Sequence, residues 1–154
     1  MSTSKIGHFV IEPSPENPGW LTFDLDITDS FNGVVLGPML VRRESDIACR
    51  LRFTPGRHIR NLRGFVHGGG LLGFIDVSLF AALRIVGGGD AAGGTTIDLA
   101  TQFQRGAEVD KPLDALVEIL RETGQLVFVR GVLEQDGNAV AAYHGTIRKP
   151  GRPL

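Results

Sequence analysis

Apolar and polar residues alternate along three stretches of the chain, in the pattern typical of half-buried β-strands. These stretches are residues 21–27, 47–53 and 95–103, where every second side chain is apolar or β-branched. Between the first two, residues 30–38 (SFNGVVLGP) predict a turn or a short helix. The segment before Trp20 holds three prolines and predicts an irregular arm.

A longer stretch, residues 69–86, is apolar on nearly every side and predicts a buried helix. The GGGD run at 87–90 ends it, because glycine commonly follows the last helical turn. Its length would suit a membrane span, but it contains Asp76 and Arg84, and a charge within lipid is costly. We therefore expect a core helix. The basic loop before it, residues 54–66, is long enough to be functional or disordered.

The remaining strands follow the helix, at residues 114–122, 126–135 and 139–149. The first of them could pass for a helix, but Thr123-Gly124 and the β-rich stretch after it favour a strand pair. Asp136-Gly137 is a strong hairpin signal. Two strands, one long helix and four sequential strands predict an α+β fold, in which an antiparallel sheet wraps around the helix.

Size and charge narrow the class of protein. The 154 residues suit one domain, and a net charge of −1 gives no reason to expect nucleic acid or a membrane as partner. Cys49 is the only cysteine, which excludes an intramolecular disulfide. The N-terminus has no apolar stretch of the kind found in secretion signals, so we expect a cytoplasmic protein. With no P-loop and no metal-ligand spacing of histidines, we expect neither a cofactor nor a metal.

Candidate chemistry gathers where the predicted helix begins. Gly68, Gly69, Gly70 and Gly73 fall in its first turns, although a glycine costs about 1 kcal/mol inside a helix. Bare N–H groups at a helix start can stabilise an oxyanion, whereas close packing against the sheet is the alternative explanation. Asp76 is the only acid on this apolar helix. An isolated carboxylate in such a place is often catalytic, and a structural hydrogen bond at an interface is the alternative.

These residues follow the spacing N-x5-H-G-G-x6-D from Asn61 through His67 to Asp76. The segments TTIDL, FQRGA, TG and DGNAVA come after it in order, beginning at Thr95. Over roughly residues 30–148 the chain resembles the phenylacetate-degradation-type branch of the 4-hydroxybenzoyl-CoA thioesterase superfamily. The resemblance implies a hotdog fold, with residues 1–29 as an arm and extra strand and 30–154 as the thioesterase domain, a single domain overall. It also implies a homo-oligomer, either a dimer or a dimer of dimers (a homotetramer).

The resemblance further implies a role for each matching residue. Asp76 is the general base or nucleophile, the Gly68 N–H helped by His67 polarises the thioester carbonyl, Asn61 orients the water or the carbonyl, and Thr96 positions the water. The carboxylate comes from one subunit, and the Asn and His-Gly elements come from the other. The positions expected to contact the acyl-CoA substrate are Gly69, Gly124 and the basic Arg63 and Arg105, whose charge suits phosphates.

The predicted activity is hydrolysis of a small or aromatic acyl-CoA, and two other functions stay open. A non-catalytic acyl-CoA-binding regulator is one, since hotdog domains also bind ligands without reaction; the presence of Asp76 disfavours it. A hotdog hydratase or dehydratase is the other. It would need a histidine paired with an acid, and the spacing from His67 to Asp76 fits that less well.

Overall fold

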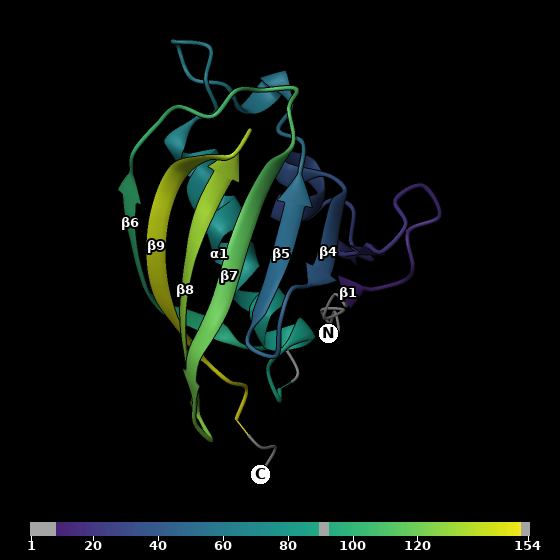
Figure 1. The fold of residues 1–154 in the computed structure, drawn as a ribbon, viewed down its shortest axis with the longest axis vertical. Helices are drawn as coiled ribbons and strands as arrows, with labels where there is room; N and C mark the ends of the chain where they lie inside the picture. The colour runs from purple at the N-terminus through teal and green to yellow at the C-terminus, as the bar shows by residue number, and fades with distance from the viewer. Residues whose placement is uncertain (1–8, 90–92, 152–154) are drawn as a thin grey trace, which may run out of the picture.

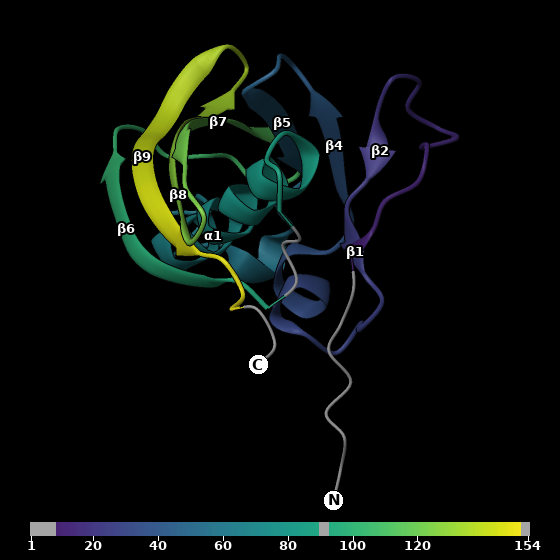
Figure 2. The same cartoon turned by 90° about the horizontal axis from the view of Figure 1, so that it is seen from below.

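A curved antiparallel sheet surrounds one long helix in the computed structural model, which describes residues 9–89 and 93–151. The sheet has seven strands in the order β2-β4-β5-β7-β8-β9-β6, and a separate pair joins β1 to β3. Figures 1 and 2 show the large sheet curling around α1. The predicted α+β fold is therefore confirmed. The start of the predicted arm and Asp90 of the predicted glycine turn lie outside the described residues.

The elements in chain order are β1 (Phe9–Val10), β2 (Leu21–Thr22), β3 (Asp24–Leu25), the π-helix η1 (Asn32–Leu36), β4 (Met39–Arg43), β5 (Ala48–Phe53), the 3-10 turn η2 (Arg57–Ile59), α1 (Gly68–Ile85), β6 (Thr95–Phe103), β7 (Leu113–Glu122), β8 (Leu126–Gln135) and β9 (Asn138–Arg148). The predicted helix and the four strands after it agree with these bounds to within a residue or so. The short helix expected within residues 30–38 is η1.

The core lies between α1 and the inner face of the sheet. The inner face presents alternate residues of each strand, such as Leu51 and Phe53 of β5, which are buried. The ring centroids of Phe53 and Phe74 lie 4.3 Å apart and join β5 to the helix. By length and composition α1 could cross a membrane, but 56% of it is buried within the fold. That burial agrees with the predicted core helix.

Two polar side chains in the core, Ser78 and Tyr143, are paired with each other. Ser78 on α1 donates to the Ile75 carbonyl at 2.7 Å and accepts from the Tyr143 hydroxyl at 2.7 Å. Burial raises the pKa of Tyr143, so the hydroxyl keeps its proton. Burial also raises the pKa of Cys49 to about 12. The Cys49 thiol therefore lies in the core and is not suited to act as a nucleophile.

The N-terminal part differs from the prediction in two places. Residues 21–27 do not form one strand: β2 pairs with β4, β3 pairs with β1, and Phe23 between them is buried. The Phe23 ring stacks on the Phe9 ring, with their centroids 4.4 Å apart. This contact lies where the chain passes from one sheet to the other. The second difference is β4, which the pattern did not predict. It is only five residues long, directly follows Gly37 and Pro38, and does not alternate between apolar and polar residues.

The two edges of the large sheet are unlike. At one edge β2 is two residues long, and Trp20 beside it is buried between the guanidinium groups of Arg42 and Arg52, each 4.6 Å from the ring centroid. At the other edge β6 is nine residues long and pairs only with β9. The second edge therefore leaves a row of backbone groups exposed along its length.

Candidate active site

Asp76 lies in the middle of α1 and is hydrogen-bonded to Thr96, the second residue of β6. The Thr96 hydroxyl donates to the Asp76 carboxylate at 2.6 Å, and both residues are half-buried. A β-bulge between Thr96 and Asp98 shifts the register, which lets Thr96 face the helix on the same side as Leu99. Two residues predicted to act together are therefore in contact.

His67 caps the helix start and leaves the Gly68 N–H available. The His67 Nδ1 accepts from the Gly69 N–H at 2.9 Å, so the neutral ring carries its proton on Nε2. The Gly68 N–H, the first of the helix, donates to no group in the described chain. A backbone N–H at this end of a helix attracts negative charge. The geometry suits the predicted contact with a thioester carbonyl.

Different structural reasons explain why glycine stands at positions near the helix start. A Cβ at Gly73 would lie 2.5 Å from the Phe31 ring, and one at Gly70 would lie 3.3 Å from Ile59, so packing explains both. A Cβ at Gly68 would make only an ordinary contact with Phe103, at 3.7 Å. Packing within the chain therefore does not require glycine at position 68.

Four of the predicted residues line one cavity of about 500 Å³ beside the helix start: Asn61, Arg63, Gly68 and Arg105, together with Phe103 and Gly106. The Asn61 side-chain oxygen accepts from the N–H groups of Arg63 and Phe65, at 2.9 and 3.2 Å. It thereby holds the loop before the helix in a tight turn. The predicted polar and cationic groups on this side of the helix therefore converge.

The predicted residues nevertheless form two separate groups. Gly68 and Asp76 are eight residues apart on one helix, which is about 12 Å along its axis. Gly124 belongs to the Thr96 end, because Thr95 aligns with Arg148 of β9, which aligns with Leu126 of β8. One group holds Asp76, Thr96 and Gly124; the other holds Asn61, Arg63, His67, Gly68, Gly69 and Arg105. A single chain does not bring its carboxylate to its own helix start.

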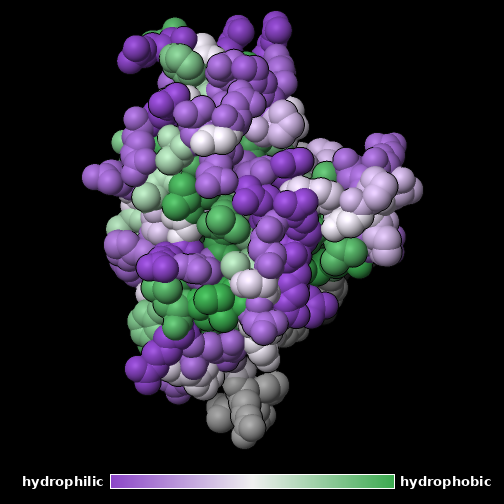
Figure 3. Space-filling view, in the orientation of Figure 1, coloured by the Kyte–Doolittle hydropathy of each residue, from purple (hydrophilic) through white to green (hydrophobic). Residues whose placement is uncertain are grey.

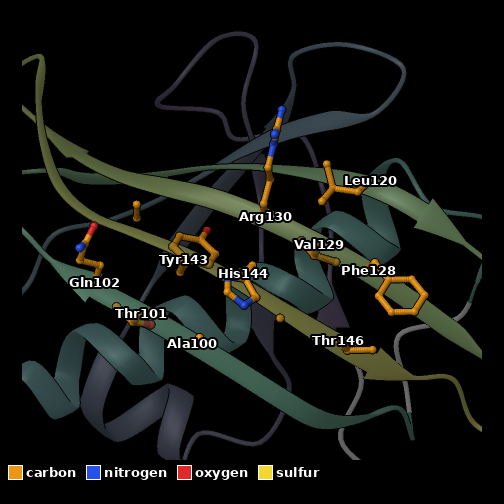
Figure 4. A pocket seen from close by; sticks show the side chains of 12 residues that line it. Ala100, Thr101, Gln102, Leu120, Phe128, Val129, Arg130, Tyr143, His144 and Thr146 are labelled. Carbon is orange, nitrogen blue, oxygen red and sulfur yellow. The ribbon is translucent and has the colours of Figure 1, made fainter.

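A larger cavity, about 680 Å³, lies elsewhere and is lined by none of the predicted site residues. It is a groove on the outer face of the sheet, where His144 and Phe128 project from β9 and β8 (Figure 4). Figure 3 shows hydrophobic residues running down the middle of this face between hydrophilic ones. Size alone does not identify the site, since no carboxylate or helix start faces this groove.

Phe103 and Phe31 are site neighbours to which the sequence assigned no role. Phe103 lines the cavity at Gly68, and its sequence signals were its place at the end of an alternating strand and at the start of the FQRGA segment. Phe31 touches Gly73, 42 positions later, and no local pattern predicts such a contact. Among residues 9–89 and 93–151, no three His, Cys, Asp or Glu side chains are grouped to hold a metal ion.

Several solved structures share this architecture, and thioesterases are among them. A hypothetical thioesterase from Streptococcus pneumoniae, solved with coenzyme A, superposes with a TM-score of 0.65 at 16% identity, covering 75% of this chain and 91% of that one. PaaI, from the phenylacetic acid degradation operon of E. coli, gives 0.61 at 17%, with coverages of 68% and 73%. Mouse thioesterase superfamily member 2 gives 0.60 at 17%, with 71% and 80%. The hotdog fold is therefore confirmed.

The family follows from the sequence profile. The profile of the Thioesterase superfamily matches residues 63–142, just over half of the 154-residue chain. No curated protein sequence matches significantly. The chain belongs to the Thioesterase superfamily and is a thioester hydrolase. The matched range begins after Asn61 and includes His67, Asp76, Thr96 and Gly124.

Proposed function

We propose that this protein hydrolyses small or aromatic acyl-CoA thioesters to free acid and CoA, at a site shared by two subunits. The observation that carries the proposal is the separation of Asp76 and Thr96 from Asn61, His67 and the free Gly68 N–H. These are complementary halves of one hydrolytic site, and they lie at opposite ends of the open strand β6.

A second copy of the chain would unite the two halves. A twofold axis at the open edge pairs β6 with its own copy, and such a pairing is necessarily antiparallel. Thr96 and Phe103, about 23 Å apart along the strand, would then each lie opposite the other's copy. Thr96 is bonded to Asp76, and Phe103 lies against Gly68. Each shared site would therefore combine Asp76 of one subunit with Gly68 of its partner.

Hydrolysis at this site needs three functions. Asp76 acts as general base or nucleophile, and the Thr96 hydroxyl orients its carboxylate and the attacking water. The partner's Gly68 N–H donates to the carbonyl oxygen as negative charge develops there, and Asn61 orients the carbonyl or the water. The C–S bond then breaks, and the CoA thiolate takes up a proton.

The CoA portion would lie over the cavity beside the helix start. Arg63 and Arg105 line that cavity, and both guanidinium groups are exposed to solvent, where they can bind phosphates. The bound coenzyme A in the Streptococcus pneumoniae thioesterase supports this class of substrate. A hydratase finds less support, because the His67 Nδ1 is bonded to a backbone N–H and not to an acid.

Mixing two inactive variants tests the shared site. Asn61→Ala and Asp76→Asn chains, each nearly inactive alone, are co-refolded in equal amounts and assayed by thiol release. Random pairing makes about half the dimers mixed, and one site in each mixed dimer carries neither lesion. About a quarter of wild-type activity should therefore return.

The control is subunit exchange, demonstrated by native mass spectrometry of differently tagged chains. The same spectrum gives the mass of the assembly and separates a dimer from a dimer of dimers. If exchange is complete and activity stays at the average of the two variants, the site lies within one chain.

A further inference from the structure

Phe31 lies against the helix one turn from the proposed carboxylate. Its Cζ and Cε1 atoms are 2.5 and 2.6 Å from the place that a Cβ at Gly73 would occupy, so the ring rests on bare helix backbone. Phe31 comes from the segment before η1 and is 53% exposed. No residue larger than glycine at position 73 would permit this contact.

Gly73, Leu72 and Asp76 share one side of α1. Gly73 precedes Asp76 by three residues and Leu72 precedes it by four. Both therefore lie on the Asp76 side of the helix within about one turn, about 5 Å along the axis. Leu72 is 38% exposed although it is apolar. Leu72 and the Phe31 ring are therefore two exposed apolar groups within about one helical turn of Asp76 on its own subunit.

A cavity of about 280 Å³ lies beside the Phe31 ring, toward the helix start. Phe31, Val35 and Ile59 form its apolar lining, and His58, Arg60, His67, Gly69 and Gly70 line the rest. This volume falls just below the usual range for small-molecule sites, which begins at about 300 Å³. Phe31 therefore both lines this cavity and contacts Gly73, one turn from Asp76.

The two halves of the shared site differ in charge, and this difference would orient a bound thioester. The cationic groups Arg63 and Arg105 lie on the partner's half of the shared site, where the charged CoA portion would bind. The apolar side chains Phe31 and Leu72 lie on the subunit that supplies Asp76. The acyl group would therefore point along the helix toward Phe31.

We infer that Phe31, seated on Gly73, sets the acyl length that the enzyme accepts, and that it restricts the substrate to short or aromatic acyl groups. A flat aromatic or short acyl group fits against the ring beside Asp76. A long alkyl chain meets the ring and cannot reach the cavity beside it. This inference rests on the proposed function, because it takes Asp76 as the site of hydrolysis.

The test measures kcat/KM by thiol release for acetyl-, hexanoyl-, lauroyl-, benzoyl- and phenylacetyl-CoA. The wild type should favour the short and aromatic thioesters. Phe31→Ala should raise the ratio of lauroyl to phenylacetyl activity by about tenfold or more, since single methylene differences in apolar pockets already change selectivity by that order. Phe128→Ala, which removes a partly exposed phenylalanine from the outer face, is the matched control and should leave the ratio unchanged.

Gly73→Ala gives a second, independent measurement. Its methyl group must displace the Phe31 ring. As a single substitution it should therefore change the ratio of lauroyl to phenylacetyl activity at least threefold. In the Phe31→Ala background the change should vanish, because the ring that it displaces is gone. Each value is a ratio of two activities of the same preparation, so partial unfolding of one variant does not change it.

The outcomes separate the two proposals. If the wild type releases no thiol from any of the acyl-CoAs, the proposed function fails and this inference fails with it. If the wild type is active but its acyl preference is the same in Phe31→Ala and Gly73→Ala, the proposed function stands and Phe31 does not set the acyl length.

Discussion

The two edges of the large sheet end in opposite ways. The β2 edge is two residues long and is closed by the arm, whose Trp20 is held between Arg42 and Arg52. Arg52 also binds Asp114 through two hydrogen bonds of 2.6 and 2.8 Å, which ties the closure to β7. The β6 edge is nine residues long and is not covered by any other described element.

We infer from this difference that one edge serves stability and the other serves the proposed function. An open edge strand invites unwanted pairing, and proteins usually shorten or cover it. This chain covers one edge with its own residues and leaves the other open, and the open one carries Thr96 and Phe103 at its two ends. We therefore expect changes at the β6 edge to alter activity, and changes at the β2 edge to alter stability.

The largest expected effect is at Asp76 of α1, which is bonded to Thr96 at the open edge. Asp76→Asn keeps the size of the side chain and its bond to Thr96 but removes the base or nucleophile. Turnover should fall by about a hundredfold to ten-thousandfold, as is typical when acid–base catalysis is lost. The melting temperature should stay close to that of the wild type. Activity near the wild-type level with the best acyl-CoA would show that the carboxylate has another role.

At the closed edge, Trp20→Ala should destabilise the fold by about 3 kcal/mol, because it removes a buried aromatic side chain and two cation–π contacts. Urea unfolding measures the loss, and kcat below the unfolding transition should be unchanged. Val10→Ala, on the same arm but 39% exposed, is the control and should shift stability by less than about 0.5 kcal/mol. A large loss of kcat in folded Trp20→Ala would contradict the division between the two edges.

The smallest expected effect concerns self-association. Ile97 lies in the β6 bulge and is 55% exposed, so Ile97→Lys puts a charge on the proposed interface. Dissociation of the dimer should increase about tenfold, which is 1.4 kcal/mol. Ile47→Lys is the matched control, since Ile47 is 52% exposed and lies at the turn before β5. Equal dissociation constants for the two variants, measured by analytical ultracentrifugation, would place the interface elsewhere.

The sequence predicted the helix and the long strands because their patterns extend over many residues. The alternation of β6 and the apolar run of α1 are each long enough to identify the element as a strand or a helix. β4 was missed because its five residues, MLVRR, follow a proline and do not alternate between apolar and polar. The division of residues 21–27 was missed because the stacking of Phe23 on Phe9 joins residues from different strands.

The candidate site was predictable where its parts are close in sequence. The spacing from His67 to Asp76 is a helix start followed by two turns, and that length is fixed by helix geometry. The bond from Thr96 to Asp76 was predicted only through the family resemblance. Phe31 could not be predicted, because its contact with Gly73 depends on how η1 packs against the helix. The roles of all these residues remain predictions.

The burial of Cys49 makes the chain well suited to chemical labelling. Its thiol is buried and its pKa is raised to about 12, so thiol reagents at neutral pH will leave it unmodified. Because Cys49 is the only cysteine, the wild-type chain itself should give no background. A single cysteine introduced at Ala100, near the middle of β6, would be the only reactive group. A spin label or a cross-linker there could then report how close two copies of the strand approach.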